Sequence, residues 1–483
     1  MKLTELLQGI AVLECTAAPD TEIASVCYDS RKTGAGALFV AIVGYATDGH
    51  AYIGMAKEKG AAAVLCERKP CENVPYILVK NSRRALALLG ANFFRHPARE
   101  MCMIGVTGTN GKTTSTYLLK QILERCCGAK VGLIGTNQNM IGEEVIPTER
   151  TTPESFELHR LFREMADAGC SHVVMEVSSH ALYEDRVYGI DYALSLFTNL
   201  TQDHLDFHST MENYCDAKAL LYRQSKIGVV NADDAWAERL LKDSTSHNVF
   251  YGVHSAADYT ASDISLASDH VAYTVHHGGE SHAAYAALPG EFNVYNSLGV
   301  LAAACELGGI TLSDAVAALK TAAGARGRVE VIPTPGKDYT ILIDYAHTPD
   351  ALENVLRTAK GFSKGRVVAV FGCGGDRDKL KRPIMGRIAA ANADFVIVTS
   401  DNPRTEVPCE IIKDILAGME DCPVPYAVVE NRIEAVHYAM DHAEANDVIV
   451  LCGKGHETYQ IRKDGIVPFD EREIIKNFCT THE

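Results

Sequence analysis

The last third of the chain alternates short apolar runs with amphipathic segments, from about residue 331 to residue 483. Apolar runs bounded by polar residues predict buried strands, and segments with a 3.6-residue period predict helices. Their regular alternation predicts a doubly wound, Rossmann-like α/β sheet. The expected strands are residues 339–345, 366–373, 394–400, 426–430 and 447–452, and the expected helices are 350–360, 382–391, 410–419 and 433–443.

The middle of the chain, residues 99–330, predicts a second parallel sheet, which is followed by a β-rich stretch and two helices. Its apolar runs are again short and separated by helical patterns, as in βαβ units. The expected strands are residues 101–106, 131–135, 170–177 and 194–199. The expected helices include 213–222, 290–307 and 313–321, and the β-rich stretch is 247–288.

Residues 1–98 predict a small α/β domain that ends where His96-Pro97 blocks helix continuation. A chain of 483 residues is long enough for roughly three domains. We therefore expect domains at 1–98, 99–330 and 331–483. The N-terminal strands are expected at residues 36–44 and 63–65, and the helices at 51–59 and 83–94.

Composition narrows the class of protein. Hydrophobic residues make up 47% and charged residues 22%, as in soluble globular proteins. No run approaches the roughly 20 apolar residues of a membrane helix, and the N-terminus lacks the apolar core of a signal peptide. The fifteen cysteines include no C-x-x-C pair, which indicates reduced thiols. The net charge of −16 argues against nucleic acid as the main partner. We expect a cytoplasmic monomer without membrane insertion.

A phosphate loop is the strongest chemical signal. Val106-Thr-Gly-Thr-Asn-Gly-Lys-Thr-Thr114 follows an apolar run and precedes a helical pattern. Glycines there let backbone N–H groups and a helix N-terminus face a polyphosphate, while the lysine can reach its β- and γ-phosphates. The pattern G-x-x-x-x-G-K-[ST] lacks only its first glycine, where Val106 stands. The candidate ATP-binding residues are Gly108, Thr109, Asn110, Gly111, Lys112, Thr113 and Thr114.

Three further residues follow the phosphate loop on successive elements: Glu176, His204 and Lys218. A lone histidine is usually structural and a lone helical lysine is usually solvated. However, a carboxylate at the end of a parallel strand beside a phosphate loop is placed to bind Mg²⁺. An ammonium does not fit a metal's ligand shell, whereas a lysine carbamylated by CO₂ does. We therefore hypothesise that Lys218 is carbamylated.

Four expected strand ends of the last third carry charged or polar clusters. They are Asp344-Tyr-Ala-His347, Gly372-Cys-Gly-Gly-Asp-Arg377, Asp401-Asn-Pro-Arg404 and Gly453-Lys-Gly-His-Glu457. Ligands bind at the carboxyl ends of such strands. An arginine can bind a carboxylate in a two-pronged way, and a carboxylate such as Glu457 can hold an ammonium. Solvated loops would explain one cluster, but four favour a site for a zwitterionic amino acid.

Three other polar positions have alternative interpretations. Asp29-Ser30-Arg31 is either a polar turn or part of a ligand pocket. Thr152 could be the N-cap of a helix that has Pro153 in its first turn. Arg328 is either a solvated linker residue or a phosphate contact.

With these residues in view, the whole chain resembles the ATP-dependent muramyl peptide ligases of peptidoglycan synthesis. The motifs that carry the resemblance are Thr107-Gly-Thr-Asn-Gly-Lys-Thr-Thr114, Glu176-Val-Ser-Ser-His180, Asp203-His-Leu-Asp206, Asp344-Tyr-Ala-His-Thr-Pro349, Gly374-Gly-Asp-Arg-Asp378 with Lys381-Arg-Pro383, and Gly453-Lys-Gly-His-Glu457.

The resemblance implies three domains that bind the uridine nucleotide, ATP and the incoming amino acid in that order. It implies ATP, UDP-N-acetylmuramoyl-L-alanyl-D-glutamate and meso-diaminopimelate as substrates, joined through an acyl phosphate. Lys112, Lys218, His204 and Glu176 would be catalytic, and Thr113, Glu176, His204 and carbamylated Lys218 would organise Mg²⁺. Further ATP contacts would be Asn293, Arg328, Asp344 and His347. The UDP-linked substrate would contact Ser30, Tyr45, Ala46, Thr47, Thr151, Thr152, Ser178, Glu184 and Arg186. Diaminopimelate would contact Arg377, Asp401, Asn402, Pro403, Arg404, Gly453 and Glu457.

The chain departs from the family pattern at Arg326, where proline is common, and at Glu184, where glutamine is common. Tyr45-Ala46 replaces the usual His-Gln. Closure of the third domain over the second is expected, with Gly324 and Gly327 as a hinge.

The alternatives are an L-lysine-adding ligase, a folylpolyglutamate synthase-like ligase and a nucleotide-dependent switch without ligation. Arg404 favours diaminopimelate, because lysine has no second carboxylate for it to bind.

Overall fold

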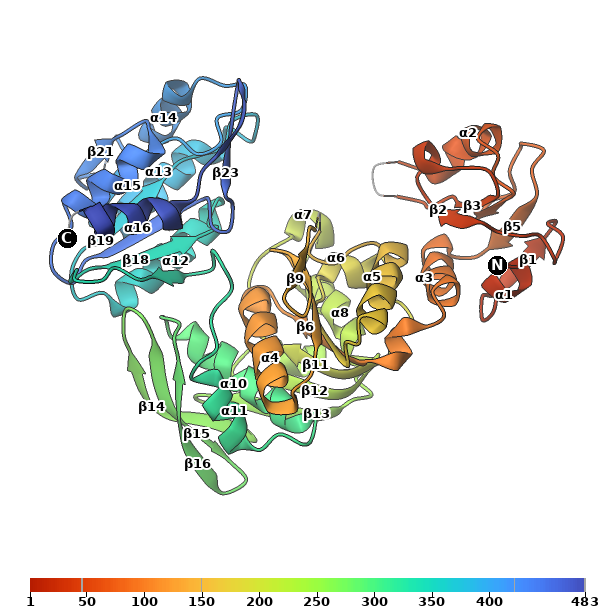
Figure 1. Cartoon of the computed structure of the whole chain (residues 1–483), viewed down its shortest axis with the longest axis horizontal. Coiled ribbons are helices and arrows are strands. Elements are labelled where there is room, and N and C mark those ends of the chain that lie inside the picture. The colour runs from red at the N-terminus through yellow and green to blue at the C-terminus, as the bar shows by residue number, and fades with distance from the viewer. Residues whose placement is uncertain (45–46, 149, 421, 482–483) are drawn as a thin grey trace. The chain divides into compact units, whose positions relative to one another are not determined.

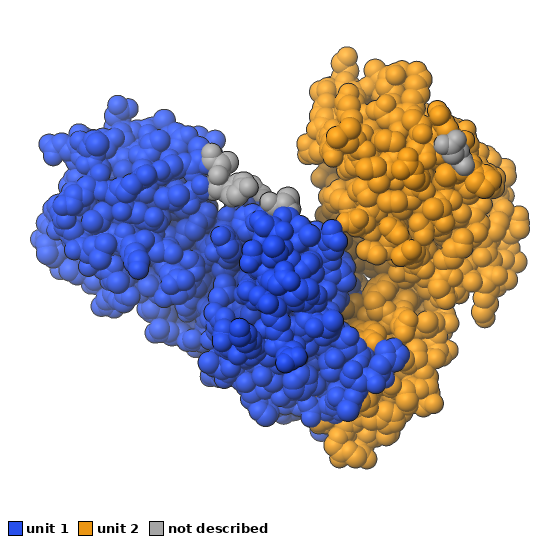
Figure 2. Space-filling model, turned by 180° about the vertical axis from the view of Figure 1, so that it is seen from behind, with its two compact units in different colours: residues 1–258, 299–311 blue, residues 259–298, 312–483 orange. Residues whose placement is uncertain are grey.

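A computed structural model describes residues 1–44, 47–148, 150–420 and 422–481 (Figure 1). The chain separates into two compact units, which Figure 2 distinguishes by colour. Unit 1 comprises Met1–Asp258 with Gly299–Thr311, and unit 2 comprises Tyr259–Leu298 with Leu312–Glu483. The predicted α/β class is confirmed.

The N-terminal part of unit 1 is a five-stranded sheet in the order β1-β5-β4-β3-β2, in which only β1 is antiparallel to its neighbour. Helix α3 begins after Asn81, whose side chain accepts a hydrogen bond from the Arg84 amide and caps the helix. The elements are α1 (Leu3–Leu6), β1 (Val12–Cys15), β2 (Ser25–Cys27), η1 (Ser30–Lys32), β3 (Ala37–Val40), η2 (Gly49–Tyr52), α2 (Ile53–Glu58), β4 (Ala63–Cys66), β5 (Tyr76–Val79), α3 (Ser82–Phe93) and η3 (Pro97–Glu100).

A larger sheet forms the rest of unit 1, in the order β13-β12-β11-β6-β10-β7-β8-β9. All neighbours are parallel from β13 to β7, whereas β8 and β9 form an antiparallel edge hairpin. β6 therefore lies inside the sheet, and the phosphate loop leaves its carboxyl end. The strands are β6 (Cys102–Thr107), β7 (Val131–Ile134), β8 (Asn139–Ile141), β9 (Glu144–Ile146), β10 (His172–Glu176), β11 (Tyr192–Phe197), β12 (Ser225–Asn231) and β13 (His247–Gly252). The helices are α4 (Lys112–Cys127), α5 (Ser155–Asp167), α6 (Ser179–Tyr183), α7 (Leu205–His208), α8 (Met211–Tyr222) and α9 (Ala237–Leu240).

Unit 2 contains an antiparallel β14-β15-β16 meander and a six-stranded sheet in the order β17-β18-β22-β19-β20-β21. In the second sheet only β17 is antiparallel, so the predicted doubly wound sheet is confirmed. The strands are β14 (Tyr259–Leu266), β15 (Val271–His277), β16 (Glu280–Ala286), β17 (Glu330–Ile332), β18 (Thr340–Asp344), β19 (Val367–Phe371), β20 (Phe395–Val398), β21 (Tyr426–Val428), β22 (Val448–Cys452), β23 (Tyr459–Arg462) and β24 (Gly465–Pro468). The helices are α11 (Leu312–Leu319), α12 (Pro349–Phe362), α13 (Lys381–Asn392), α14 (Pro408–Leu416), α15 (Arg432–Asp441) and α16 (Glu471–Thr481). Helix α10 (Phe292–Glu306) crosses from unit 2 to unit 1 in sequence.

The six-stranded sheet is covered on both faces, as its apolar strands require. Leu342 of β18 packs in one core cluster with Leu356 of α12 and Met385 of α13. Its neighbour Ile343 points to the opposite face, where it packs with residues of α15 and α16 such as Val436. The polar strand-end residues follow the carboxyl ends of β18, β19, β20 and β22, at one edge of the sheet.

Two expectations about local structure need correction or detail. Thr152 is not the N-cap of α5, because the helix begins at Ser155 and Glu154 accepts the Ser155 N–H. Gly327, which with Gly324 is expected to form a hinge, lies within unit 2. Its N–H donates to Glu330 Oε2 at 2.6 Å, and its carbonyl accepts from the Tyr345 N–H at 3.0 Å. A rotation at Gly327 would break both bonds. Within the described ranges, we find no helix whose length and apolar character would carry it across a bilayer.

A buried histidine in α5 predicts a pH-dependent stability. His159 is 3% exposed, and burial lowers its pKa to about 4 from an ordinary 6.5. The folded state therefore binds this proton less readily than the unfolded state. Its contribution to stability is complete above pH 6.5 and is lost as the pH falls towards 4, by about 3 kcal/mol in total.

We expect His159→Leu to flatten this acid-dependent loss of stability, since leucine cannot titrate. Urea unfolding above, within and below the interval measures the free energy of unfolding at each pH. His247→Gln, at an exposed position of β13, is the matched control. The same pH slope for the wild type and His159→Leu would contradict the assignment.

Candidate active site

The phosphate loop joins β6 to α4, as predicted. Gly108 has φ +150° and Gly111 has φ +85°, conformations that side chains rarely adopt. A Cβ atom on Gly108 would come within 1.9 Å of Thr198 Oγ1, so no larger residue fits there. The loop therefore needs glycine at both positions, and Thr113 and Thr114 enter the first turn of α4 as buried side chains.

The end of β11 supports this loop, which sequence analysis had not predicted. Thr198 Oγ1 donates to the Asn110 carbonyl at 2.6 Å, and the Thr109 N–H donates to the Asn199 carbonyl at 2.8 Å. The Asn110 N–H donates to Asn199 Oδ1 at 3.0 Å. These contacts fix the main chain of the phosphate loop and so fix the start of α4, where Lys112 lies.

Lys112 and Lys218 converge on one carbonyl oxygen of the loop. Each Nζ donates to the Gly108 oxygen at 2.9 Å, and Lys112 Nζ also donates to the Thr109 oxygen at 2.8 Å. Lys218 is 1% exposed. Burial, and then the charge of Lys112, lower the pKa of Lys218 well below its usual range. The site therefore favours a neutral amine at Lys218, which is the nucleophilic form of lysine.

Tyr214 connects the loop with two of the predicted ligands. Its hydroxyl lies 3.2 Å from Thr109 Oγ1, and its ring centroid lies 4.6 Å from Lys218 Nζ. The His204 ring packs edge-on against it at 6.0 Å and against the His180 ring at 4.7 Å. His204 and Lys218 are thus brought to one region, as predicted, and the residue between them was not recognised from the sequence.

Glu176 is fully buried at the end of β10 and accepts three hydrogen bonds. Oε1 accepts from Thr113 Oγ1 at 2.9 Å and from the Thr136 N–H at 2.8 Å, and Oε2 accepts from Thr136 Oγ1 at 2.9 Å. A Cβ atom on Gly135 would lie 2.5 Å from Oε1, so that glycine makes room for the carboxylate.

The Glu176 carboxylate and the Thr113 hydroxyl supply some of the oxygen ligands that Mg²⁺ needs. A carboxylate beside a threonine hydroxyl is typical of Mg²⁺ sites, which keep several waters. Across the residues with a described position, no three His, Cys, Asp or Glu side chains form a ready metal site. The fit therefore depends on oxygen atoms that ATP or a carbamylated Lys218 would add.

Four of the residues predicted to contact the UDP-linked substrate lie close to Glu176. Thr152 Oγ1 donates to the Glu176 carbonyl at 2.8 Å and accepts from the Ser178 N–H at 3.2 Å. Thr151 Oγ1 lies 3.0 Å from Thr136 Oγ1. Arg186 Nη1 donates to the Thr152 carbonyl at 3.1 Å.

The remaining residues predicted for the UDP-linked substrate lie in the N-terminal part. Ser30 is buried in η1 and Thr47 is exposed, while Tyr45 and Ala46 lie outside the described residues.

In unit 2, three of the four further ATP candidates surround Tyr345. The Arg328 guanidinium lies 5.6 Å from the centre of its ring, and His347 Nδ1 lies 2.8 Å from its carbonyl oxygen. The preceding Asp344 accepts from the N–H groups of Val329 and Ala346, both at 2.8 Å. Burial raises the pKa of Asp344, and the charge of Arg328 opposes that rise.

The fourth candidate, Asn293, is buried in α10. Its Nδ2 donates to the Pro289 carbonyl at 2.8 Å, and its Oδ1 accepts from Asn296 Nδ2 at 2.9 Å. These contacts fix the start of the helix.

The strand-end clusters at Asp401–Arg404 and Gly453–Glu457 meet, as the parallel sheet requires. Asn402 Nδ2 donates to Glu457 Oε2 at 3.0 Å, and Lys454 Nζ donates to Asn402 Oδ1 at 2.6 Å and Glu457 Oε2 at 3.0 Å. Lys454 is fully buried, although sequence analysis gave it no role. A Cβ atom on Gly453 would lie 2.4 Å from Asp401 Oδ2, so the two loops are in close contact.

Arg404 lies above the glycines of a third strand-end loop. Its φ is +52°, and its Nη1 donates to the carbonyls of Gly375 at 2.9 Å and Asn402 at 3.4 Å. A Cβ atom on Gly375 would lie 1.9 Å from the Pro403 carbonyl oxygen. Arg377, from the same loop, is exposed and donates to the Asp376 carbonyl at 3.2 Å. The arrangement presents guanidinium and carboxylate groups at one edge of the sheet.

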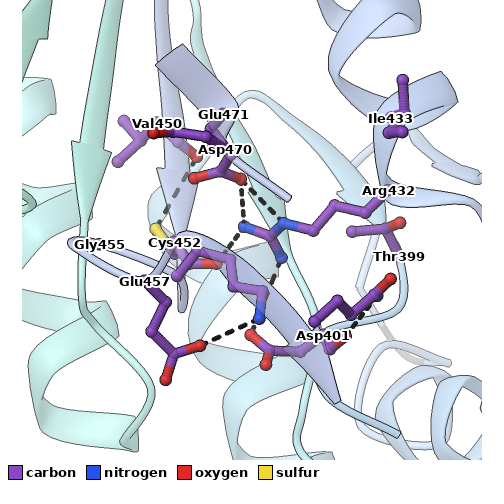
Figure 3. Close-up of polar contacts among 12 residues, drawn as sticks. Thr399, Asp401, Arg432, Ile433, Val450, Cys452, Gly455, Glu457, Asp470 and Glu471 are labelled. Carbon is purple, nitrogen blue, oxygen red and sulfur yellow. Dashed lines mark hydrogen bonds and ion pairs between the residues drawn. The ribbon is translucent and has the colours of Figure 1, made fainter. Parts of the chain in front are cut away.

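A buried ion pair supports this edge (Figure 3). Arg432 of α15 donates through Nε to Glu471 Oε1 and through Nη2 to the Cys452 carbonyl, both at 2.8 Å. Its Nη1 lies 3.9 Å from Asp401 Oδ2. Because both charged groups are nearly inaccessible, loss of either one would leave a buried charge. Arg432 therefore fixes two strand ends and was not recognised from the sequence.

Comparison with known proteins agrees with this geometry. The chain matches the Mur ligase middle domain over residues 106–304, the Mur ligase glutamate ligase domain over 327–455, and the Mur ligase family catalytic domain over 22–94. Together with the relatives described next, these matches show that the chain belongs to the Mur ligase family. The expected resemblance is confirmed.

Among its relatives are proteins named UDP-N-acetylmuramoyl-L-alanyl-D-glutamate–2,6-diaminopimelate ligase. The one from Clostridium botulinum is 48% identical over 94% of this chain and 95% of its own length. The one from Clostridium tetani is 47% identical over 99% of both chains.

Two solved structures give the same fold. A UDP-N-acetylmuramoyl-L-alanyl-D-glutamate–2,6-diaminopimelate ligase is 31% identical, with a TM-score of 0.74 over 100% of this chain and 99% of its own. A Mycobacterium tuberculosis folylpolyglutamate synthase complexed with ADP and AMPPCP is 17% identical, with a TM-score of 0.60 over 77% of this chain and 92% of its own. The second likeness concerns the fold alone.

Proposed function

We propose that this protein is an ATP-dependent ligase that adds meso-diaminopimelate to UDP-N-acetylmuramoyl-L-alanyl-D-glutamate in peptidoglycan precursor synthesis. The observation that carries the proposal is the pairing of two sites in one chain. Lys112 lies in a phosphate loop, and Arg404 with Glu457 forms an edge suited to a zwitterionic amino acid. Relatives at 48% and 47% identity carry the name of this activity.

The first step transfers the γ-phosphoryl group of ATP. An oxygen of the D-glutamate carboxylate attacks the γ-phosphorus, the bond to the β-bridging oxygen breaks, and ADP leaves. Two anions approach each other in this step, so cations must offset their repulsion and the charge of the transition state. Lys112 supplies one such charge, and the glycines around it let the loop approach the phosphates.

Thr113 and Glu176, with His204 and a carbamylated Lys218, would hold Mg²⁺. When bound, the ion would neutralise charge on the phosphate oxygens. Around it, Thr136 orients Glu176 by two hydrogen bonds, and Tyr214 keeps Lys218 close to the loop.

The second step forms the amide. The unprotonated amino group of diaminopimelate attacks the acyl carbon, the carbon–oxygen bond to phosphate breaks, the nitrogen gives up one proton to solvent, and inorganic phosphate leaves. This step depends mainly on orientation of the amine. We assign that role to the strand-end loops that carry Arg404 and Glu457. Glu457 would bind the second ammonium of the amino acid, and Arg404 would bind its carboxylate.

The residue assignments follow the same scheme. We propose a domain for the uridine nucleotide at 1–98, an ATP domain at 99–330 and an amino-acid domain at 331–483. ATP contacts are Gly108, Thr109, Asn110, Gly111, Lys112, Thr113, Thr114, Asn293, Arg328, Asp344 and His347. Contacts to the UDP-linked substrate are Ser30, Tyr45, Ala46, Thr47, Thr151, Thr152, Ser178, Glu184 and Arg186. Contacts to diaminopimelate are Arg377, Asp401, Asn402, Pro403, Arg404, Gly453 and Glu457.

We expect Arg404→Ala to raise the KM for meso-diaminopimelate about 10- to 100-fold, the effect of losing a hydrogen-bonded charged group. The KM for ATP should stay unchanged, because Arg404 lies in the loop after β20 and not in the phosphate loop. Steady-state kinetics with each substrate varied in turn measures this. Arg462→Ala in β23 is the control, since Arg462 bonds only to Gln460 Oε1 among the contacts described. An Arg404→Ala enzyme with an unchanged KM would remove the basis for this choice of amino acid.

Leaving out one reaction component at a time tests the ligase activity itself. Phosphate release is measured with ATP, Mg²⁺, the UDP-linked dipeptide and meso-diaminopimelate, and then with each one left out. We expect release only from the complete mixture, apart from a slow background. Release that needs neither the dipeptide nor the amino acid would favour a nucleotide switch instead.

A further inference from the structure

Three segments of unit 1 bring five charged side chains together beside Thr152. Arg83 comes from the first turn of α3, Arg150 and Glu154 precede α5, and Glu184 and Arg186 follow α6. Arg83, Glu154, Glu184 and Arg186 are all largely buried, with 10–19% of each side chain exposed. We call these five residues the arginine–glutamate cluster. Three arginines face two glutamates, so one positive charge is in excess among them.

Glu184 is shared between two arginines. Its Oε2 accepts a very short contact from Arg186 Nη2, while its Oε1 lies 3.5 Å from Arg83 Nη2. Each carboxylate oxygen therefore has its own guanidinium. If Arg186 were drawn towards another anion, Arg83 would remain to neutralise Glu184.

Glu154 does not satisfy the remaining donors. Its Oε2 lies 3.6 Å from Arg83 Nη1 and 3.6 Å from Arg186 Nε, longer than hydrogen bonds. Both nitrogens are buried and lack a hydrogen-bond partner within the described part of the chain. A buried unpaired donor is costly. Both donors lie at ion-pair distance from Glu154 Oε2 without a hydrogen bond to it, so each can still donate to a further acceptor.

The cluster adjoins the residues proposed to hold the UDP-linked substrate. Arg186 Nη1 donates to the Thr152 carbonyl, and Thr152 Oγ1 donates to the Glu176 carbonyl at the end of β10. Helix α3 also fixes the turn between Glu184 and Arg186, because Arg84 Nε and Asn81 Nδ2 each donate to Asp185 at 3.1 Å. Arg83 and its neighbour Arg84 thus contact the same turn through different carboxylates.

We propose that Arg83 is a positioning residue for the anionic peptide of the UDP-linked substrate, and that it acts by neutralising Glu184. With Arg83 present, Arg186 can bind a substrate carboxylate without leaving Glu184 as an unpaired negative charge beside it. Without Arg83, Glu184 competes for Arg186 and repels the substrate. This inference rests on the proposed function, and it explains how a chain with glutamate at position 184 accepts an anion there.

The test combines Arg83→Gln with Glu184→Gln. We expect Arg83→Gln to weaken binding of the UDP-linked dipeptide at least about tenfold, the effect of one hydrogen bond to a charged group. We expect the double variant Arg83→Gln/Glu184→Gln to recover most of this loss, because the carboxylate that needed neutralising is gone. Calorimetric binding of the dipeptide, and its KM against kcat, are measured for each variant.

Arg84→Gln is the matched control, since Arg84 lies next in sequence, contacts the same turn and is 55% exposed. We expect it to change binding less than threefold. Equal losses in Arg83→Gln and Arg84→Gln, or a double variant no better than Arg83→Gln, would overturn the proposal in favour of a structural role in holding the turn. Thermal unfolding of each variant shows whether it is folded. Absence of dipeptide binding and ligation in the wild type would instead contradict the proposed function itself.

Discussion

Replacing Lys112 with methionine is expected to lower the rate of ATP-dependent amide formation about 10³-fold, because the first chemical step loses a fixed positive charge at the phosphates. Methionine keeps the unbranched shape of the side chain but cannot neutralise the approach of a carboxylate to the γ-phosphoryl group. It also cannot donate to the carbonyls of Gly108 and Thr109, which Lys112 now does. Rapid-quench measurement of ADP formation isolates this step.

Lys120→Met tests whether the effect belongs to this position or to α4 as a whole. Lys120 lies on the same helix and pairs with Glu124 at 2.7 Å, away from the phosphate loop. We expect it to lose stability and to keep most of its rate. Calorimetry should show that Lys112→Met still binds the UDP-linked dipeptide. A Lys112→Met enzyme with a near-normal rate would show that the loop does not carry the chemistry.

Lys218→Ala should lower the rate of amide formation about 10²- to 10³-fold, and short carboxylic acids should restore part of it. Burial and the nearby Lys112 lower the pKa of Lys218, which favours the neutral amine, the form that adds to CO₂. The nitrogen–carbon bond then forms, a proton leaves, and the side chain ends in a carboxylate. Acetate or formate would supply that carboxylate in the space left by the alanine variant.

Carbon-13 NMR of the wild type under labelled bicarbonate should detect the carbamate directly, and Lys218→Ala should lack the signal. Lys226→Ala, at an exposed position on the next strand, is the control and should keep both signal and rate. Full activity of Lys218→Ala would exclude any catalytic part for this lysine. An inactive variant that no carboxylate restores, in an enzyme without the carbamate signal, would exclude the carbamate.

Sequence patterns predicted the parallel sheets well because their strands are buried on both faces and appear as short apolar runs. The phosphate loop was identified for another reason: its glycines, its lysine and the flanking elements are consecutive in sequence. By contrast, β1, β2, β5, β8, β9, β12, β17, the β23–β24 hairpin and α16 were not predicted. Of these, β5 and β12 lie inside their sheets, whereas β1, β2, β9 and β17 are edge strands and the hairpin and α16 follow the last motif.

Residues that support the site from a distant segment were harder to predict. Thr198 and Asn199 end a predicted strand, and only the rule about carboxyl ends of strands could have selected them. Arg83, Tyr214 and Arg432 lie in helices where nothing distinguishes them from ordinary surface or core residues. Their partners lie far away in the chain: Arg432 bonds to Glu471, which is 39 positions away, and Tyr214 lies against Thr109, which is 105 positions away. Such contacts depend on tertiary structure, which a local pattern does not contain.

A competition between two amino acids shows which one the enzyme adds. The wild-type enzyme is given ATP, Mg²⁺ and UDP-N-acetylmuramoyl-L-alanyl-D-glutamate with equal concentrations of meso-diaminopimelate and L-lysine, and the products are separated by mass. We expect the diaminopimelate product to dominate, and each molecule of it to be accompanied by one ADP and one phosphate. A predominant lysine product, or ATP hydrolysis without either product, would contradict it.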